Sequence, residues 1–456
     1  MNTHAIILAA GRGTRMNSAL PKVLHTVGGQ PMLAHVLRAA GALGAQQHLV
    51  LGHGAEQVQA WLQQAGVAPT VALQTEQLGT AHAVQQALPA VPDEAQVVVL
   101  YGDVPLVSAQ TLAALQGAAA SGLALVTVTL ENPAGYGRIL RDASGRVTGI
   151  VEQKDASEPQ RAIREINTGL LAAPAASLKR WIAQVQNHNA AAEFYLTDIV
   201  ALAVAEGVDV RTVTAASAAE VEGVNDRVQL AHAERLLQLR NAERLMRAGV
   251  QLADPARFDL RGELIAGQDV FIDVGVIIEG KVELADGVRV GAYSHLKNVK
   301  LGARSEVLSH CVLENLDAGT ACRIGPFARV RMDTQFGDEV HIGNFVEIKK
   351  SRIGALTKAG HLAYVGDAQV GADVNIGAGV ITCNYDGANK HVTTIGDGAF
   401  IGTDTQLVAP VTIGARAFVA AGSTITRNVA DDALAICRAR DQKTIAGWKR
   451  PRKQPK

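Results

Sequence analysis

The stretch IGDGAFIGTDTQLVAPVTIGARAFVAAGSTI, residues 395–425, carries an aliphatic residue at every sixth position, and glycine follows several of them. A six-residue unit is too short to bury a core of its own, whereas stacked units place their aliphatic side chains in one continuous interior. The stretch therefore predicts a parallel β-helix, a solenoid of hexapeptide repeats with small residues at its corners. The repeating positions are Ile395, Ile401, Leu407, Ile413, Val419 and Ile425.

The same six-residue step recurs earlier in the chain, at Ile272, Ile278, Leu284, Val290 and Leu296 and again at Val370 and Ile376. We therefore expect the solenoid and a C-terminal tail to occupy residues 250–456. The stretch TCNYDGANKHVTT, residues 382–394, breaks the period. It is expected to leave the coil as a projecting loop, where functional residues tend to gather.

Residues 1–226 have a different texture, because apolar β-rich runs alternate with Ala- and Leu-rich helical patterns. This alternation predicts an α/β domain with a mostly parallel sheet covered by helices on both faces. Residues 228–248 contain neither Gly nor Pro, which is typical of an uninterrupted helix. We expect this helix, at 227–249, to link the two domains.

The composition disfavours several classes of protein. The 43 basic residues balance 43 acidic residues, so no global field draws the chain to nucleic acid or to an anionic membrane. No apolar run approaches the roughly 18 residues of a membrane-spanning helix, and no signal peptide is evident, which favours a cytoplasmic location. The four cysteines form no CxxC arrangement, so we expect reduced thiols without a metal role.

The stretch LAAGRGTRM, residues 8–16, places two glycines behind an apolar run near the N-terminus. Glycine lets backbone N–H groups approach phosphate oxygens, and Arg15 and Lys22 can neutralise the phosphate charge. The stretch matches neither common phosphate-binding signature. An ordinary strand-to-helix turn therefore remains open as the alternative for this segment.

The stretch VVVLYGDVPL, residues 97–106, is an apolar strand that ends in Gly102 and Asp103. Ligands of open α/β sheets bind outside the carboxyl ends of the strands, and an aspartate there can hold Mg²⁺ against phosphates. Its alternative role is to cap the next helix, but Ser108 is the better candidate for that cap. The segment favours a nucleotide crevice over a simple turn.

These two stretches and six further motifs resemble, in order along the chain, those of bacterial N-acetylglucosamine-1-phosphate uridylyltransferases. The further motifs are LPKVLH (20–25), EQLGTAHAV (76–84), GYGRI (135–139), VEQKDA (151–156), INTGL (166–170) and VEGVND (221–226). The solenoid extends the resemblance to the bifunctional enzymes that are also glucosamine-1-phosphate acetyltransferases. The resemblance implies a Rossmann-like domain, a left-handed β-helix, a homotrimer with the acetyl site between subunits, and UDP-N-acetylglucosamine as the product, a precursor of peptidoglycan and lipopolysaccharide.

The resemblance also implies the residues of the uridylyl site, where the sugar 1-phosphate attacks the α-phosphorus of UTP and pyrophosphate leaves. Such a transfer needs positioning and charge neutralisation rather than a protein nucleophile. The family's residues that lie along the nucleotide correspond in this sequence to Leu8, Ala9, Ala10, Gly11, Tyr101 and Gly102. Its phosphate contacts correspond to Arg15 and Lys22. Uracil and ribose contacts match Gln74, Gly79 and Thr80, sugar contacts match Gly137, Glu152 and Asn167, and Mg²⁺ ligands match Asp103 and Asn225.

In the solenoid the resemblance rests on FARVR (327–331), NFVEIKK (344–350), AGHLAYVGD (359–367) and ITCNYDG (381–387). It makes His361 the catalytic base, which suits an imidazole whose ordinary pKa is about 6.5, and we expect Glu347 to orient it. Sugar-phosphate contacts match Arg331, Lys349, Tyr364, Asn375 and Lys390, and acetyl-CoA contacts match Asn384, Tyr385, Thr403, Ala421 and Arg438.

Two departures from the family pattern concern the solenoid. Met332 and Asp333 stand where the family commonly has Pro-Gly, and Thr403 replaces a common Ser. Two other functions remain open at this point. A nucleotidyltransferase for another sugar, such as a glucose-1-phosphate adenylyltransferase, would not need His361. A scaffold or exchange-factor subunit would not need the Mg²⁺ ligands.

Overall fold

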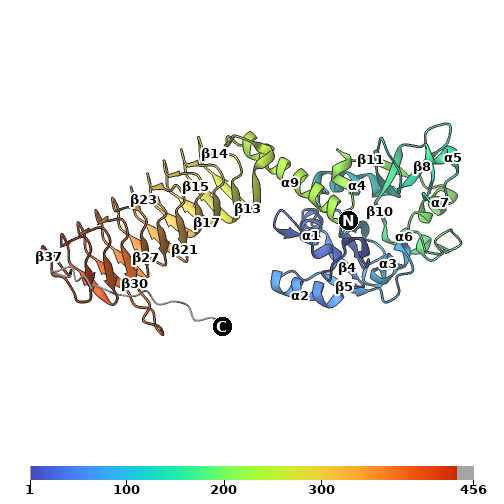
Figure 1. Ribbon diagram of the computed structural model, residues 1–456. Helices are drawn as coiled ribbons and strands as arrows, with labels where there is room; N and C mark the ends of the chain where they lie inside the picture. Colours follow the sequence, from blue (N-terminus) through green and yellow to red (C-terminus); the bar gives the residue numbers. More distant parts are fainter. Residues whose placement is uncertain (1, 439–456) are drawn as a thin grey trace, which may run out of the picture. The chain divides into compact units, whose positions relative to one another are not determined.

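The computed structural model describes residues 2–438 and divides into two compact units between Leu237 and Gln238 (Figure 1). The division falls inside α9 (Arg227–Arg247), the helix expected at 227–249. The first unit is an α/β domain and the second is a parallel β-helix, so the predicted fold class is confirmed. Within residues 2–438, no helix is both long and apolar enough to cross a membrane.

The sheet of the first unit is mostly parallel. Its strand order is β11 (Arg211–Thr214), β7 (Ala124–Thr129), β10 (Glu165–Pro174), β6 (Gln96–Tyr101), β1 (Thr3–Ala9), β4 (Gln46–Leu51), β5 (Thr70–Leu73). Only β10 in this row runs antiparallel to its neighbours, and the hairpin of β8 (Gly137–Arg141) and β9 (Val147–Val151) pairs with it. The carboxyl ends of β1 and β6 therefore lie side by side.

Helices cover both faces of this sheet, which explains its unbroken apolar runs. Along β1, Ala5 and Ile7 join the core under α1 (Met32–Gly41), α2 (Ala55–Ala65) and α4 (Ala109–Ala118). The alternate residues Ile6 and Leu8 join the core under α3 (Thr80–Ala87), α6 (Ala175–Ile182) and α7 (Asp198–Ala205). Successive strand residues point to opposite faces, so a strand buried on both faces must be apolar throughout.

The second unit is a three-walled solenoid in which the ladders are parallel. An 11-stranded sheet forms one wall and includes β23 (His341–Asn344), β26 (Lys358–His361) and β29 (Asn375–Ile376). A 15-stranded sheet forms the other two, because β19 (Val312–Ala318) pairs with both β21 (Arg329–Arg331) and β22 (Thr334–Phe336). The next strands are β24 (Glu347–Lys349), β27 (Tyr364–Gly366) and β30 (Ile381–Cys383) on one wall and β25 (Arg352–Ile353), β28 (Ala368–Val370) and β31 (Thr393–Ile395) on the other.

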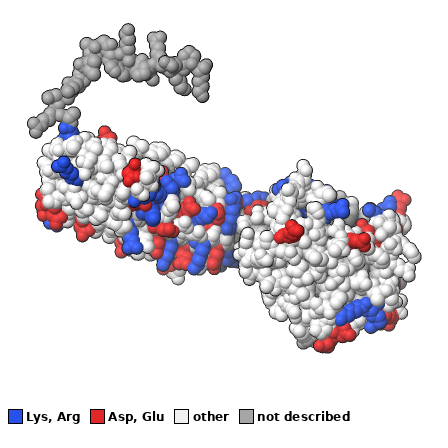
Figure 2. Space-filling view, turned by 90° about the horizontal axis from the view of Figure 1, so that it is seen from below, with Lys and Arg blue, Asp and Glu red and all other residues white. Residues whose placement is uncertain are grey.

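The repeating aliphatic residues are buried in the solenoid interior, as predicted; Ile401 in β32 (Phe400–Ile401), for example, is 0% exposed. The stretch that breaks the period forms a hairpin between β30 and β31, closed by an antiparallel bridge between Tyr385 and Lys390. On the face of the solenoid seen in Figure 2, rows of basic and acidic side chains alternate. Ion pairs form between exposed side chains of the solenoid, for example Lys281–Glu283 at 2.7 Å.

We predict that Ile401→Ala lowers the free energy of unfolding by about 2–5 kcal/mol, because it removes a fully buried side chain from the stacked interior. Urea denaturation followed by circular dichroism measures the change. Thr394→Ala is the matched control, since Thr394 lies exposed on β31, and its effect should stay within about 0.5 kcal/mol. Equal losses from the two substitutions would contradict the interior position of Ile401.

Candidate active sites

The first candidate site is a cavity of about 260 Å³ at the carboxyl ends of β1 and β6. Parallel pairing sets Leu8 opposite Tyr101, so the segments that follow both strands border the same crevice. Ten predicted residues line it: Leu8, Ala9, Ala10, Gly11, Lys22, Gln74, Gly79, Thr80, Tyr101 and Asp103. Sequence reasoning missed the other four, Val23, Gln77, Ala83 and Glu193; Val23 and Gln77 adjoin predicted residues within the recognised motifs.

Gly79 forms the N-terminal boundary of α3 in a conformation that suits only glycine. Its φ is 125°, and a Cβ placed there would lie 2.5 Å from the carbonyl oxygen of Phe194. That close approach exists because Ala81 donates to Phe194 O at 3.0 Å and Phe194 donates to Leu78 O at 2.8 Å. The segment of Gly79 and Thr80 is therefore fixed against a second loop at the edge of the cavity.

Gln74 is buried beside this segment, and only 3% of it is exposed. Its side-chain nitrogen donates to Gly79 O at 3.1 Å and lies 3.2 Å from His82 Nδ1. The carboxamide oxygen of Gln74 accepts no hydrogen bond from any residue between 2 and 438. That oxygen can accept from a ligand N–H group, as selection of a uracil base would require.

Lys22 and Asp103, which line the cavity, form a compact polar cluster with Asn225. The Lys22 ammonium donates to Asp103 Oδ2 and, at 3.1 Å, to Asn225 Oδ1. Val224 N donates to Asp103 O at 2.9 Å, which brings the Asn225 segment against Asp103. A carboxylate oxygen and an amide oxygen thus converge on one cation, and both are ligands that Mg²⁺ accepts.

A Mg²⁺ ion at this position would also need oxygen atoms from a bound substrate or from water. In the described part of the chain, no group of three or more His, Cys, Asp or Glu residues could hold a metal. Mg²⁺ commonly binds through one or two carboxylates together with substrate phosphates and water. The pair of Asp103 and Asn225 fits that kind of site.

The three predicted sugar contacts lie together outside the residues that line the cavity. Gly137 pairs with Asn167, and a Cβ on Gly137 would lie 3.2 Å from a carboxylate oxygen of Glu152. Glu152 accepts a hydrogen bond from the Thr197 hydroxyl at 3.0 Å, and burial of its carboxyl group raises its pKa.

Two further predicted residues of the uridylyl site also lie outside the residues that line the cavity. Gly102 packs beside β1, and Arg15 is exposed in η1 (Thr14–Met16).

The second candidate site lies on the solenoid around His361, the last residue of β26. Its Nδ1 lies 2.6 Å from Asn344 Oδ1, and the two residues are partners in the β23–β26 ladder. A carboxamide oxygen only accepts hydrogen bonds, so Nδ1 carries the proton and Nε2 is left as the basic nitrogen. The exposed ring of His361 therefore presents its basic atom for proton transfer.

The expectation that Glu347 orients His361 is wrong. Glu347 instead accepts from the Arg331 guanidinium at 2.8 Å. Asn344 precedes His361 by 17 residues, which is one coil of the solenoid here, whereas Glu347 stacks on Tyr364. Counting one coil along the sequence is the signal that could have found Asn344.

The predicted sugar-phosphate contacts occupy neighbouring coils. Arg331 and Lys349 are direct partners in the β21–β24 ladder, and Lys349 donates to Asp367 at 3.1 Å. Asn375 lies on the adjoining wall beside Lys358. The Lys390 ammonium lies 4.3 Å from the centre of the Tyr385 ring, a cation–π contact inside the hairpin.

The predicted acetyl-CoA contacts continue along the solenoid. Asn384 Nδ2 lies 3.4 Å from the Tyr364 hydroxyl, which connects the two predicted sets. Thr403 O accepts from Gly422 N at 2.8 Å, so Thr403 and Ala421 lie on adjacent coils. Arg438 is exposed, and its Cδ would lie 3.7 Å from a Cβ on Gly422.

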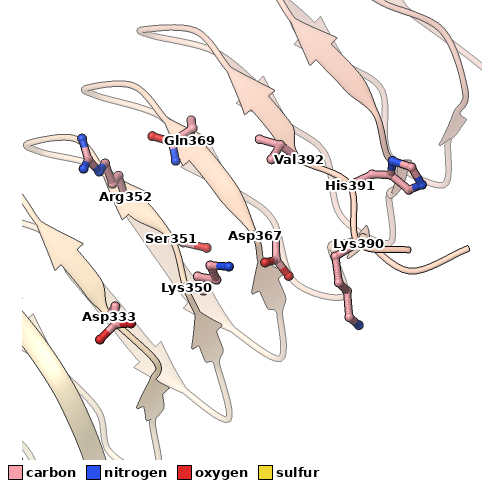
Figure 3. Close-up of a pocket in the computed structure, with 9 residues that line it drawn as sticks. All are labelled: Asp333, Lys350, Ser351, Arg352, Asp367, Gln369, Lys390, His391 and Val392. Carbon is pink, nitrogen blue, oxygen red and sulfur yellow. The ribbon is translucent and has the colours of Figure 1, made fainter. Parts of the chain in front are cut away.

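A cavity of about 350 Å³ opens beside the base of the hairpin (Figure 3). Of the predicted residues, only Lys390 lines it. The other lining residues are Asp333, Lys350, Ser351, Arg352, Asp367, Gln369, His391 and Val392. Sequence reasoning assigned none of these eight to a ligand.

Two curated relatives are similar to nearly the whole chain. The bifunctional protein GlmU of Alkalilimnicola ehrlichii is 56% identical over 451 residues, which are 99% of this chain and 97% of that protein. The bifunctional protein GlmU of Aromatoleum aromaticum is 55% identical over 451 residues, 98% of each chain. Residues 5–194 match the MobA-like NTP transferase domain, and residues 393–427 match the bacterial transferase hexapeptide family of six repeats.

A solved structure is similar at a greater distance. It is a putative glucose-1-phosphate thymidylyltransferase from Bacillus anthracis in complex with a sucrose. It is 19% identical, with a TM-score of 0.42, over 51% of this chain and 94% of its own.

Gly79→Ala is predicted to destabilise the α/β unit by about 1–3 kcal/mol, because the new Cβ meets backbone in a conformation that L residues rarely adopt. Urea denaturation of the full chain gives the change. Gly117→Ala is the matched control, since a Cβ at Gly117 in α4 meets nothing within 4 Å and alanine favours a helix. A loss for Gly79→Ala no greater than that for Gly117→Ala would contradict the close approach.

Proposed function

The chain belongs to the GlmU family of bifunctional proteins, and from this premise we propose that its two units make UDP-N-acetylglucosamine in two steps. The solenoid transfers an acetyl group from acetyl-CoA to glucosamine 1-phosphate. The α/β unit then joins N-acetylglucosamine 1-phosphate to UTP and releases pyrophosphate. Similarity along almost the whole chain disfavours both a single-function nucleotidyltransferase and a non-enzymatic scaffold. Because UTP and acetyl-CoA are the co-substrates, the proposal includes a cytoplasmic location.

The observation that carries uridylyl transfer is the cluster of Lys22, Asp103 and Asn225, of which Lys22 and Asp103 line the cavity beyond β1 and β6. We propose that the nucleotide lies between the Leu8–Gly11 segment and Gln74, which both line the cavity, with its phosphates toward Lys22. Asp103 and Asn225 would hold Mg²⁺, which neutralises phosphate charge when bound. Lys22 then turns from Asp103 to the phosphates and orients them for in-line attack.

The observation that carries acetyl transfer is the hydrogen bond from His361 to Asn344. The amine of glucosamine 1-phosphate attacks the thioester carbonyl, the C–S bond breaks, and coenzyme A leaves as the thiol. His361 Nε2 accepts the proton that the amine loses and returns it to the departing thiolate sulfur. Arg331, Lys349 and Lys390 supply cations for the sugar phosphate.

We also propose that the protein assembles as a homotrimer through its solenoid, with the acetyl site between subunits. Three exposed aromatic residues, Tyr293, Phe327 and Phe345, stack in one column through His310, with ring centres 4.9–5.4 Å apart. Leu362, next to His361, is 61% exposed. An exposed apolar column of this kind is typical of a surface that a partner covers, and the family resemblance makes that partner two further copies.

Asp103→Ala should abolish formation of UDP-N-acetylglucosamine and spare acetyl transfer, because Asp103 belongs to the α/β unit alone. Pyrophosphate release from UTP with supplied N-acetylglucosamine 1-phosphate, measured over a range of Mg²⁺ concentrations, reports the loss. The thiol released from acetyl-CoA by the same preparation is the control. Normal uridylyl transfer by this variant would show that the metal ligands are wrongly assigned.

His361→Ala should reduce acetyl transfer on the order of 10²-fold or more, as expected for loss of a general base. Uridylyl transfer from supplied N-acetylglucosamine 1-phosphate should stay near normal, since the α/β unit has its own groups. Thiol release from acetyl-CoA between pH 6 and pH 9 measures the effect. A rate and pH profile like those of the unaltered protein would remove His361 from the mechanism.

A further inference from the structure

Asp367 is a buried carboxylate that joins the two predicted substrate sets of the solenoid. It lies at the corner between β27 and β28, and 9% of its side chain is exposed. Its Oδ2 accepts from the Lys349 ammonium at 3.1 Å and also from Asn384 Nδ2. One oxygen atom therefore holds a predicted sugar-phosphate contact and a predicted acetyl-CoA contact.

The backbone of Asp367 also contacts Lys349 and the segment that follows the hairpin. Asp367 N donates to Lys349 O at 2.9 Å, and Asp367 O accepts from Thr393 N at 3.2 Å. Asn384 begins the hairpin and Thr393 follows it, so Asp367 contacts both ends of that loop. In Figure 3, Asp367 lies between the segment of Lys350 and Ser351 and the segment of Lys390 to Val392. Three consecutive coils are thus joined at this residue.

An anionic side chain is needed at this position because of the charge it faces. The Lys349 side chain is 11% exposed, and a buried ammonium needs a counter-charge. An asparagine at 367 can place its one carboxamide oxygen where Oδ2 lies, but it is neutral, so both hydrogen bonds weaken and the Lys349 ammonium loses its counter-charge. There is little room to rearrange, because a Cβ on Gly366 would lie 2.9 Å from Asn384 Nδ2.

We propose that Asp367 is a positioning residue for acetyl transfer. It fixes the Lys349 ammonium and the Asn384 carboxamide in one arrangement. The sugar phosphate and acetyl-CoA therefore bind at fixed positions relative to each other. It does not orient His361, whose Nδ1 is held by Asn344. This inference rests on the acetyl transfer proposed above.

Asp367→Asn in the full chain tests the proposal. The KM values for glucosamine 1-phosphate and for acetyl-CoA should both rise about tenfold or more, because the hydrogen bonds from Lys349 and from Asn384 both lose their charged acceptor. The pH dependence of kcat should stay unchanged, since His361 keeps its partner. Asp397→Asn is the matched control: Asp397 is an exposed corner carboxylate that accepts from Ala372 N at 2.7 Å, and both KM values should stay near normal.

A second test substitutes Lys349, first in a protein that keeps Asp367. Lys349→Met should raise the KM for acetyl-CoA as well as that for the sugar phosphate, because it leaves the Asp367 carboxylate without its cation beside Asn384. In the double variant Lys349→Met/Asp367→Asn, the rise in the acetyl-CoA KM should be smaller than the product of the two single effects. The Lys349→Met variant alone decides the matter if Asp367→Asn does not fold, which the thermal midpoint of the solenoid would reveal.

The outcomes separate this inference from the proposed function. If the unaltered protein does not transfer acetyl groups, the proposed function fails and the inference fails with it. If the unaltered protein is active and Asp367→Asn leaves both KM values unchanged, the inference alone is overturned. Multiplicative effects in the double variant, or an unchanged acetyl-CoA KM in Lys349→Met, would overturn it as well.

Discussion

Parallel strands keep equivalent positions side by side, so residues that follow neighbouring strands, or that lie one coil apart, meet in space. In the α/β unit this pairing places Leu8 opposite Tyr101, so the glycine-rich loop and Asp103 border one cavity. In the solenoid it places Asn344 opposite His361 and Arg331 opposite Lys349. Each site therefore depends on strand register, and a shift of one residue would turn its side chains to the other face.

The sequence predicts the parts of the fold that repeat or that must be apolar. The six-residue period identifies the solenoid interior because every coil needs a buried aliphatic side chain at the same position. The run from Ala5 to Ala10 indicates a strand buried on both faces, since its residues alternate between two cores. The period carries no such information about the outward positions, so it does not identify Asn344 as the partner of His361.

Other features depend on contacts that no local pattern encodes. Asn167 lies at an irregularity in the pairing of β10 with β7, and Glu152 directly follows β9; only the resemblance predicts them as sugar contacts. The corner at Met332 and Asp333 is a further case. Both residues have positive φ, 60° and 56°, whereas proline is confined to a φ near −65°. The backbone here therefore differs from what a Pro-Gly corner would allow, although Glu347 still fixes Arg331.

Charge is compensated locally in both candidate sites, because each predicted phosphate contact named next already has a partner within the protein. Lys22 is paired with Asp103, Arg331 with Glu347, and Lys349 with Asp367, while Lys390 lies over the Tyr385 ring. An unpaired cation in a partly buried site would cost desolvation energy before any ligand arrives. A phosphate must therefore compete with the protein's own carboxylates, and the exchange is easiest where the pair is most open to solvent. Arg331 and Glu347, about 30% exposed, can separate at little cost, whereas Lys349 and Asp367 are nearly buried and stay together, so Arg331 is free to follow the ligand while Lys349 holds a fixed position.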